Sequence, residues 1–144
     1  MTREIEQHLG TRPEVRLLHE GPDTMSDWEA AVLGLSRRGR AYAREIALVA
    51  DGRPVLLARS LSPMDDPVAG VLRRLQRAPL ADVLFRDPRW RRTSPPITLR
   101  WRSHVGVLPG RACLWQRQTA GGRVLVEEFF LAPLTGSFPA GADQ

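Results

Sequence analysis

The chain has 144 residues, a net charge of +5 and one cysteine. This length fits a single domain with a hydrophobic core, and one cysteine excludes an internal disulfide and a cysteine metal cluster. No apolar run approaches the roughly 18–20 residues that span a bilayer. The charged N-terminal segment Met1–Gly10 lacks an apolar signal-peptide core, so we expect a cytoplasmic protein that does not enter a membrane.

The basic residues are all arginine, and they are spread along the whole chain. A positive charge fits an anionic partner, which could be nucleic acid or a small polyanion. Nucleic-acid binders usually cluster their basic residues with stacking aromatic side chains on one surface. Here only Arg37–Arg40 and Arg86–Arg92 form local groups, for which solvated surface charge is the simpler interpretation. We therefore expect a small anionic substrate and no nucleic-acid partner.

The first part of the chain is expected to form two short helices and one strand. Ser26 is a suitable N-cap for the second helix, because its hydroxyl can accept a hydrogen bond from a free backbone N–H. The strand is expected to end at Glu20–Pro22, a segment with turn composition. The three elements are the helices Arg3–Gly10 and Ser26–Leu35 and the strand Val15–His19.

The clearest local signal is a β-hairpin in the first half of the chain. The apolar-rich runs Ala41–Ala50 and Pro54–Leu61 are separated by Asp51-Gly52-Arg53. An Asp-Gly pair between two such runs is the strongest short hairpin signal, because both residues tolerate a positive φ. We therefore predict two antiparallel strands over these ranges.

The second half of the chain predicts two more helices and three more strands. These are the helices Val68–Gln76 and Pro79–Phe85 and the strands Ile97–Val107, Ala112–Thr119 and Arg123–Leu131. The last two strands form a second hairpin around Ala120–Gly122. Antiparallel hairpins with interspersed short helices indicate an α+β domain, with a single antiparallel sheet and short helices covering one face. The domain is expected to span residues 1–134, and the tail Thr135–Gln144 to be disordered.

Two arginines fall in largely apolar stripes of the first hairpin. Side chains alternate across a strand, so Arg44 shares a face with Tyr42 and Ile46, and Arg59 shares one with Leu57. A lone charge in an apolar interior is costly, so each arginine needs a partner. One interpretation is a buried Arg–Glu pair, or an arginine whose guanidinium reaches water. The other is a cavity in which Arg44 binds a substrate carboxylate through its planar fork.

The last strand carries a glutamate on each of its faces. Glu128 alternates with Val126 and Phe130, and Glu127 alternates with Leu125. The pattern alone does not decide which glutamate accompanies Arg44.

Other candidates for chemistry are weaker. The three histidines, His8, His19 and His104, sit in no metal-ligand spacing, and Cys113 has no evident activating base. We therefore expect neither a metal nor a nucleophilic cysteine.

Five short motifs, taken in order, resemble the chorismate pyruvate-lyase family. They are the segments Met1–Arg3, Ala43–Pro54, Pro79–Phe85, Leu114–Arg117 and Glu128–Pro133. Each motif alone is weakly specific, but their order and spacing cover nearly the whole chain. The resemblance implies a chorismate lyase-like fold and conversion of chorismate to 4-hydroxybenzoate and pyruvate without a cofactor.

The same resemblance implies roles for individual residues. Arg44 binds the ring carboxylate, and Glu128, rather than its neighbour, lies near the ring oxygen at the opposite end. Met1 and Leu80 fall at positions whose backbone approaches the ligand. Arg59 is a secondary candidate for the enolpyruvyl carboxylate. The partners are thus chorismate and its aromatic product, and the protein is expected to be a monomer or dimer.

A rival hypothesis is a non-catalytic effector-binding domain. The ligand-sensing domains of GntR-type transcription regulators share this fold and also resemble the first hairpin. Such a regulator normally carries an N-terminal winged helix-turn-helix, for which we expect no room before Met1. The presence of both Arg44 and Glu128 favours the lyase.

Overall fold

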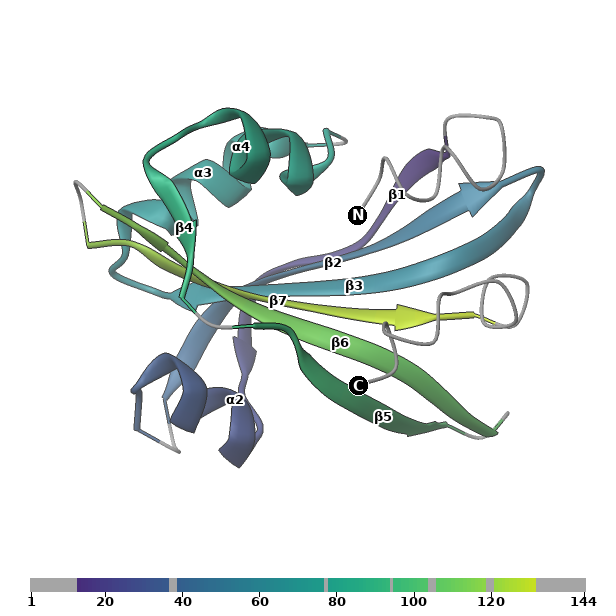
Figure 1. The fold of residues 1–144 in the computed structure, drawn as a ribbon, viewed down its shortest axis with the longest axis horizontal. Coiled ribbons are helices and arrows are strands. Elements are labelled where there is room, and N and C mark those ends of the chain that lie inside the picture. The colour runs from purple at the N-terminus through teal and green to yellow at the C-terminus, as the bar shows by residue number, and fades with distance from the viewer. Residues whose placement is uncertain are drawn as a thin grey trace.

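The computed structural model describes residues 13–36, 39–76, 78–93, 95–103, 106–118 and 121–131 (Figure 1). The expected helix Arg3–Gly10 and the tail Thr135–Gln144 lie outside the described residues. No helix in the described ranges is long and apolar enough to cross a membrane. In chain order the elements are β1 (Glu14–Thr24), α2 (Asp27–Leu33), β2 (Arg40–Ala50), β3 (Arg53–Pro63), α3 (Pro67–Leu75), α4 (Leu80–Arg86), β4 (Trp90–Arg92), β5 (Ile97–Ser103), β6 (Gly106–Arg117) and β7 (Arg123–Phe130).

All described strands belong to one antiparallel sheet. The order across the sheet is β1-β2-β3-β7-β6, and β6 pairs along its other edge with both β4 and β5. The expected α+β domain with a single antiparallel sheet is confirmed. Because β7 pairs with β3 and β6, the last strand of the domain lies in the middle of the sheet, between its two hairpin halves (Figure 1).

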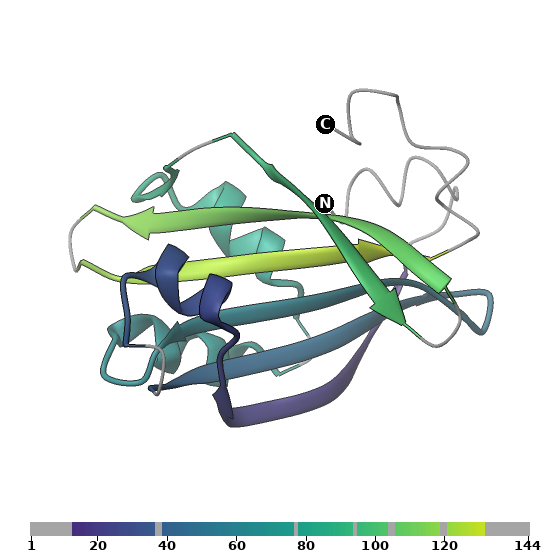
Figure 2. The ribbon, with the colours of Figure 1, turned by 90° about the horizontal axis from the view of Figure 1, so that it is seen from below.

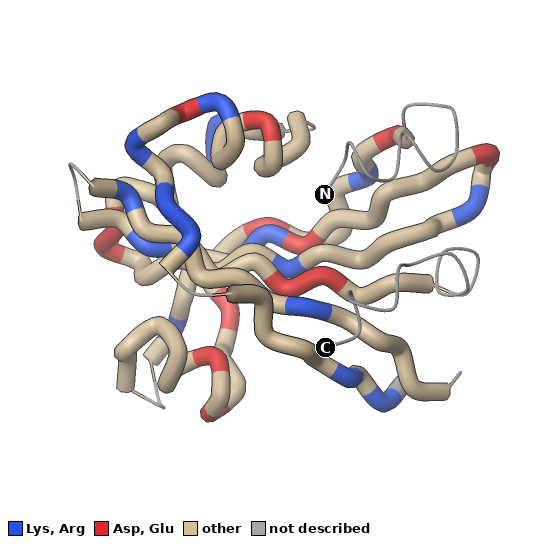
Figure 3. Tube along the Cα trace, viewed as in Figure 1, with Lys and Arg blue, Asp and Glu red and all other residues tan. Residues whose placement is uncertain are grey.

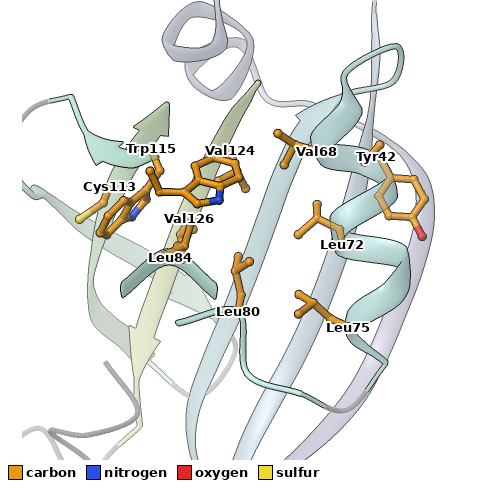
Figure 4. Close-up of a cluster of buried hydrophobic side chains, with 12 residues drawn as sticks. Tyr42, Val68, Leu72, Leu75, Leu80, Leu84, Cys113, Trp115, Val124 and Val126 are labelled. Carbon is orange, nitrogen blue, oxygen red and sulfur yellow. The ribbon is translucent and has the colours of Figure 1, made fainter. Parts of the chain in front are cut away.

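Helices cover both faces of the sheet, as the two ribbon views show (Figures 1 and 2). The expected cover on one face is formed by α3 and α4, whose apolar side chains pack on the sheet (Figure 4). On the other face, α2 packs Ala30 and Leu33 against Ala43, Leu61 and Leu125. The expected N-cap is confirmed, because the Ser26 hydroxyl accepts a hydrogen bond from the Glu29 backbone N–H.

The first hairpin forms as predicted. Asp51 has φ +52° and Gly52 has φ +77°, so both turn residues are in the left-handed region that a tight hairpin turn requires. The strands pair from Ala41↔Pro63 to Ala50↔Arg53, with an irregularity between Leu48 and Val49.

The first strand is longer than expected. The prediction that it ends at Glu20–Pro22 is wrong, because β1 continues through these residues to Thr24 and pairs Pro22 with Tyr42. Proline lacks a backbone donor, which an edge strand tolerates because one side of its backbone faces no neighbour. The glycine and proline at this point therefore do not terminate the strand.

The predicted strand Ile97–Val107 is also wrong, because two antiparallel strands replace it. Here β5 and β6 pair from Ile97↔Ala112 to Ser103↔Gly106, so the chain reverses between Ser103 and Gly106. The strand expected to begin at Ala112 begins at Gly106 instead. The prediction ended the strand before Pro109 and Gly110 because these residues are typical of turns, but both lie inside β6. A side chain at Gly110 would collide with the Glu128 carbonyl oxygen, so glycine there permits close backbone contact with β7.

The packing of α3 on the sheet makes a testable prediction. Leu72 is fully buried among the side chains of α3, α4 and the sheet, whereas Val107 is 57% exposed at the far end of β6. Truncating a buried leucine removes apolar contacts and leaves a cavity, so Leu72→Ala should lower the free energy of unfolding by about 2–5 kcal/mol. For Val107→Ala, denaturant unfolding should show a loss of less than about 0.5 kcal/mol in the free energy of unfolding. Equal effects of the two variants would contradict this packing.

Candidate functional site

Arg44 lies in the middle of β2, on the face covered by α3 and α4. It pairs with Ser60 of β3, which pairs with Val126 of β7, which in turn pairs with Cys113 of β6. Directly paired residues on antiparallel strands point to the same face. This row therefore defines which side chains accompany Arg44 on its face. Basic and acidic positions of both faces are concentrated in the middle of β2, β3 and β7 (Figure 3).

The Arg44 guanidinium is buried, and the residue paired with Arg44 on β1 is Glu20. The Arg44 side chain is 1% exposed, and its Nη2 donates hydrogen bonds of 2.9 Å to the carbonyl oxygens of Gln76 and Ala78, between α3 and α4. Among the described residues, no carboxylate lies within ion-pair distance, and Nε donates no hydrogen bond. Burial lowers the pKa of Arg44, and a Coulomb interaction with Glu20 on β1 partly opposes this. The guanidinium nevertheless stays charged.

The segment that receives Arg44 has an unusual backbone. Gln76, immediately after α3, has φ +52°, which is uncommon for a residue with a side chain. Its carbonyl accepts one of the Arg44 hydrogen bonds, and Ala78 accepts the other. Leu80 follows as the first residue of α4 (Figure 4). The structure thus brings the predicted residues Arg44 and Leu80 to the same region.

Glu128 lies on the same face as Arg44. It pairs with Ala58 of β3 and with Arg111 of β6, and it follows Val126 by two residues on β7. The Glu128 side chain is buried, and its Oε1 accepts a hydrogen bond of 3.2 Å from Arg111 Nε. From strand spacing and rise, the Cα atoms of Arg44 and Glu128 lie roughly 12 Å apart.

A small cavity opens beside Glu128. It has a volume of about 90 Å³ and lies between α4 and the sheet. Two arginines, Arg92 and Arg111, line it together with Glu128, so its polar wall carries net positive charge. Burial is the main cause that raises the pKa of the Cys113 thiol, so this lining cysteine stays protonated near neutral pH. The apolar lining is Ala81, Leu84, Phe85, Trp115 and Val126.

Arg111 is a residue that sequence reasoning missed. It hydrogen-bonds Glu128, and its guanidinium lies 5.6 Å from the centre of the Phe130 ring. Alternation from Cys113 places Arg111 on the same face, but this signal depends on knowing that the strand begins before Ala112. Arg92 belongs to the group Arg86–Arg92, for which the sequence favours solvated surface charge, and it also lines this cavity.

Arg59 does not join this site. Because Arg44 pairs with Ser60, the neighbouring Arg59 points to the opposite face, where it pairs with Glu45 and Glu127. Its guanidinium donates to Glu29 and Asp23 at 2.9 Å and to Glu45 at 2.6 Å. The ion-pair interpretation therefore holds for Arg59. Arg59, the secondary candidate for the enolpyruvyl carboxylate, therefore lies on the face opposite Arg44 and Glu128. Met1 lies outside the described residues.

Glu127 is buried in this second charged cluster. Burial, a hydrogen bond with Glu29 and that residue's negative charge together raise the pKa of Glu127 from its ordinary value of 4.5 to about 9. For Glu29, hydrogen bonds from Glu127 and Arg59 outweigh the effect of burial and lower the pKa. The two carboxyl groups therefore share one proton at neutral pH.

The raised pKa predicts a pH dependence of stability. Between about pH 4.5 and pH 9 the folded chain holds a proton on Glu127 that the unfolded chain has lost, so stability falls as pH rises through this window. Glu127→Gln cannot ionise, so its free energy of unfolding should fall less steeply from pH 5 to pH 9. Urea unfolding at several pH values measures this, with the exposed Glu14→Gln as control. Parallel pH profiles for wild type and Glu127→Gln would refute the buried protonated carboxyl.

Solved structures identify the class of fold. The effector domain of PhnF from Mycobacterium smegmatis superposes with a TM-score of 0.60 and 16% identity, covering 90% of this chain and 87% of that one. A GntR-family transcriptional regulator from Bacillus cereus gives a TM-score of 0.61 and 10% identity, covering 90% and 96%. At such identities the likeness shows the fold alone.

Sequence relatives identify the family. The chorismate lyase family matches residues 1–136. A protein of Azoarcus sp. (strain BH72) named "Probable chorismate pyruvate-lyase" is 34% identical, covering 85% of this chain and 74% of that protein. A protein of the same name from Marinobacter nauticus is 39% identical, covering 92% of this chain and 71% of that protein. The "Chorismate pyruvate-lyase" of Salmonella schwarzengrund is 35% identical, covering 91% of this chain and 76% of that protein. The chain belongs to the chorismate lyase family, and the expected resemblance is confirmed.

Proposed function

We propose that this protein is a chorismate pyruvate-lyase that converts chorismate to 4-hydroxybenzoate and pyruvate. Family membership supports the substrate class. The observation that carries the proposal is the buried Arg44 guanidinium, which shares its face with Glu128, donates to two backbone carbonyls and interacts with its strand neighbour Glu20 without a close ion pair. A buried cation needs an anion nearby, and a substrate carboxylate supplies one.

Arg44 would bind the ring carboxylate of the substrate. Two backbone carbonyls hold its Nη2 in place, while Nε makes no hydrogen bond to the described residues and can donate to a ligand. The planar guanidinium matches a carboxylate better than an ammonium does. Because these contacts fix the side chain before the ligand arrives, little conformational entropy is lost on binding.

The second carboxylate of chorismate lies on its enolpyruvyl group. Arg92 and Arg111 line the cavity beside Glu128, at the other end of the proposed ring position. We assign the enolpyruvyl carboxylate to these two arginines rather than to Arg59, which lies across the sheet. Two separate cationic positions fit a dianionic substrate.

The chemistry is a redox-neutral elimination. The bond between the ring carbon and the ether oxygen breaks, the hydrogen of the adjacent ring carbon leaves, and the ring becomes aromatic. That hydrogen ends on the methylene carbon of the enolpyruvyl group, which becomes the methyl group of pyruvate. The hydrogen can move directly from the ring carbon to the methylene carbon, or Glu128 can accept it as a proton and pass it on. Both routes give the same products. In either route the protein holds the reactive conformer away from water, and its arginines stabilise the charge that develops on the leaving group.

The activity test compares two neighbouring glutamates. Purified protein incubated with chorismate should release equal amounts of pyruvate and 4-hydroxybenzoate, followed by coupled reduction of pyruvate and by chromatography. If Glu128 transfers or donates a proton, Glu128→Gln should lower kcat by about 10²–10⁴-fold, far more than Glu127→Gln. A larger loss of kcat in Glu127→Gln than in Glu128→Gln would contradict the proposal, because Glu127 lies on the opposite face of the sheet. Absence of product together with tight 4-hydroxybenzoate binding would favour the effector-binding alternative.

The carboxylate test uses a change that keeps the charge. Arg44→Lys retains a cation but loses the planar fork, so 4-hydroxybenzoate should bind at least about tenfold more weakly, the equivalent of one charged hydrogen bond. Isothermal titration calorimetry measures the affinity. Arg40→Lys, an exposed position on the same strand, is the matched control. If Arg44→Lys and Arg40→Lys both bind as wild type does, Arg44 does not hold the ring carboxylate.

A further inference from the structure

Glu20 of β1 stands at the end of the row of paired residues that contains Arg44. It pairs directly with Arg44 across β1 and β2, so both side chains point to the face covered by α3 and α4. One of its carboxylate oxygens, Oε1, is buried from solvent, and its negative charge acts on the Arg44 guanidinium. A carboxylate is therefore built into the sheet beside the cation assigned to the ring carboxylate of the substrate.

Arg44 does not form a close ion pair with this neighbour. Its Nη2 donates instead to the carbonyl oxygens of Gln76 and Ala78, each at 2.9 Å, and these two bonds hold the guanidinium against the segment between α3 and α4. Its Nε donates no hydrogen bond to the described residues. Glu20 thus compensates the charge of Arg44 from a distance and leaves a donor of the arginine free for a ligand.

Other side chains keep the Glu20 carboxylate in its place. Tyr42 precedes Arg44 by two residues on β2 and shares its face, and its hydroxyl interacts with the side chains of both Glu20 and Arg73. The Arg73 guanidinium lies 4.8 Å from the centre of the Tyr42 ring. Burial and then the negative charge of Glu20 raise the pKa of Tyr42, so its hydroxyl stays protonated and can donate to the carboxylate. Glu20 is therefore positioned by contacts that do not use Arg44.

A carboxylate bound at Arg44 would lie close to a like charge. Neighbouring strands are about 5 Å apart, so a ligand carboxylate on the Arg44 guanidinium sits within about one Debye length, roughly 8 Å, of Glu20. Between partly buried groups, repulsion at that distance weakens binding by about tenfold. Glu20 is half-buried, so solvent screening reduces the effect without removing it. Arg44 therefore favours the binding of an anion, and Glu20 opposes it.

We propose that Glu20 is a positioning residue that acts through Arg44, weakening the hold on the ring carboxylate and so speeding the release of the aromatic product. This inference rests on the proposed lyase function, in which the substrate and the aromatic product carry the same ring carboxylate. The elimination leaves that carboxylate unchanged, so nothing in the reaction itself breaks its contact with Arg44. A fixed negative charge beside Arg44 speeds dissociation without touching the reacting atoms.

The test measures how tightly the full chain binds 4-hydroxybenzoate, by isothermal titration calorimetry, and how fast it releases it, by stopped-flow fluorescence. Glu20→Gln removes the charge and keeps the size, so the affinity should rise by about 3–10-fold and the dissociation rate should fall by a similar factor. Glu20→Asp keeps the charge and should stay within about twofold of wild type. Glu14→Gln removes the same charge from an exposed position at the other end of β1 and should bind as wild type does. Wild-type or weaker binding by Glu20→Gln, or an unchanged dissociation rate, would overturn the proposal.

Two comparisons separate charge from shape, and this inference from the proposed function. The neutral analogue 4-hydroxybenzamide has the shape of the product without its charge, so Glu20→Gln should change its affinity by less than about twofold. Equal gains for the acid and the amide would contradict a charge effect. Unchanged product affinity in Glu20→Gln, with an active wild type, would overturn only the role of Glu20. Tighter 4-hydroxybenzoate binding by Glu20→Gln, in a protein that releases no pyruvate from chorismate, would support the action of Glu20 on carboxylate binding and overturn the lyase.

Discussion

The register of β2, β3 and β7 determines where the ionisable side chains of the sheet lie. Because Arg44 pairs with Ser60 and Ser60 with Val126, Arg44 and Glu128 share one face, and Arg59 and Glu127 share the other. A shift of one residue between β2 and β3 would move Arg59 to the face of Arg44. The pairing of these strands therefore places two ionisable side chains on each face.

The two faces solve the problem of buried charge in different ways. On one face, Arg44 is compensated by two backbone carbonyls, and we propose that a substrate carboxylate completes its surroundings. On the other face, Arg59 is surrounded by carboxylates, and the surplus negative charge is partly removed by a proton on Glu127. Arrangements of this kind are costly to keep buried, because both partners lose their hydration.

The fold positions these groups through strands rather than flexible loops. Arg44, Glu128 and Arg111 stand on three strands of one sheet, and residues of α4 line the cavity beside Glu128 and Arg111. Side chains held on a rigid sheet keep the separation that a ring-shaped substrate requires. Outside the sheet, Gln76 also holds the Arg44 guanidinium through its backbone carbonyl, and it does so from a backbone conformation with a positive φ.

The sequence by itself determined the local features of this protein. Asp51-Gly52 specified the first hairpin, Ser26 specified the start of α2, and alternation marked Arg44 as out of place in a plain core. It could not place β5 and β6, because Pro109 and Gly110 have turn composition while lying inside a strand, and it therefore missed Arg111. Alternation left open which glutamate accompanies Arg44, and the family resemblance pointed to Glu128, which strand pairing places on the face of Arg44. Only the tertiary structure decided that Arg59 lies across the sheet. Strand alternation is a property of one segment, whereas the pairing of one strand with the next depends on contacts between residues far apart in the chain.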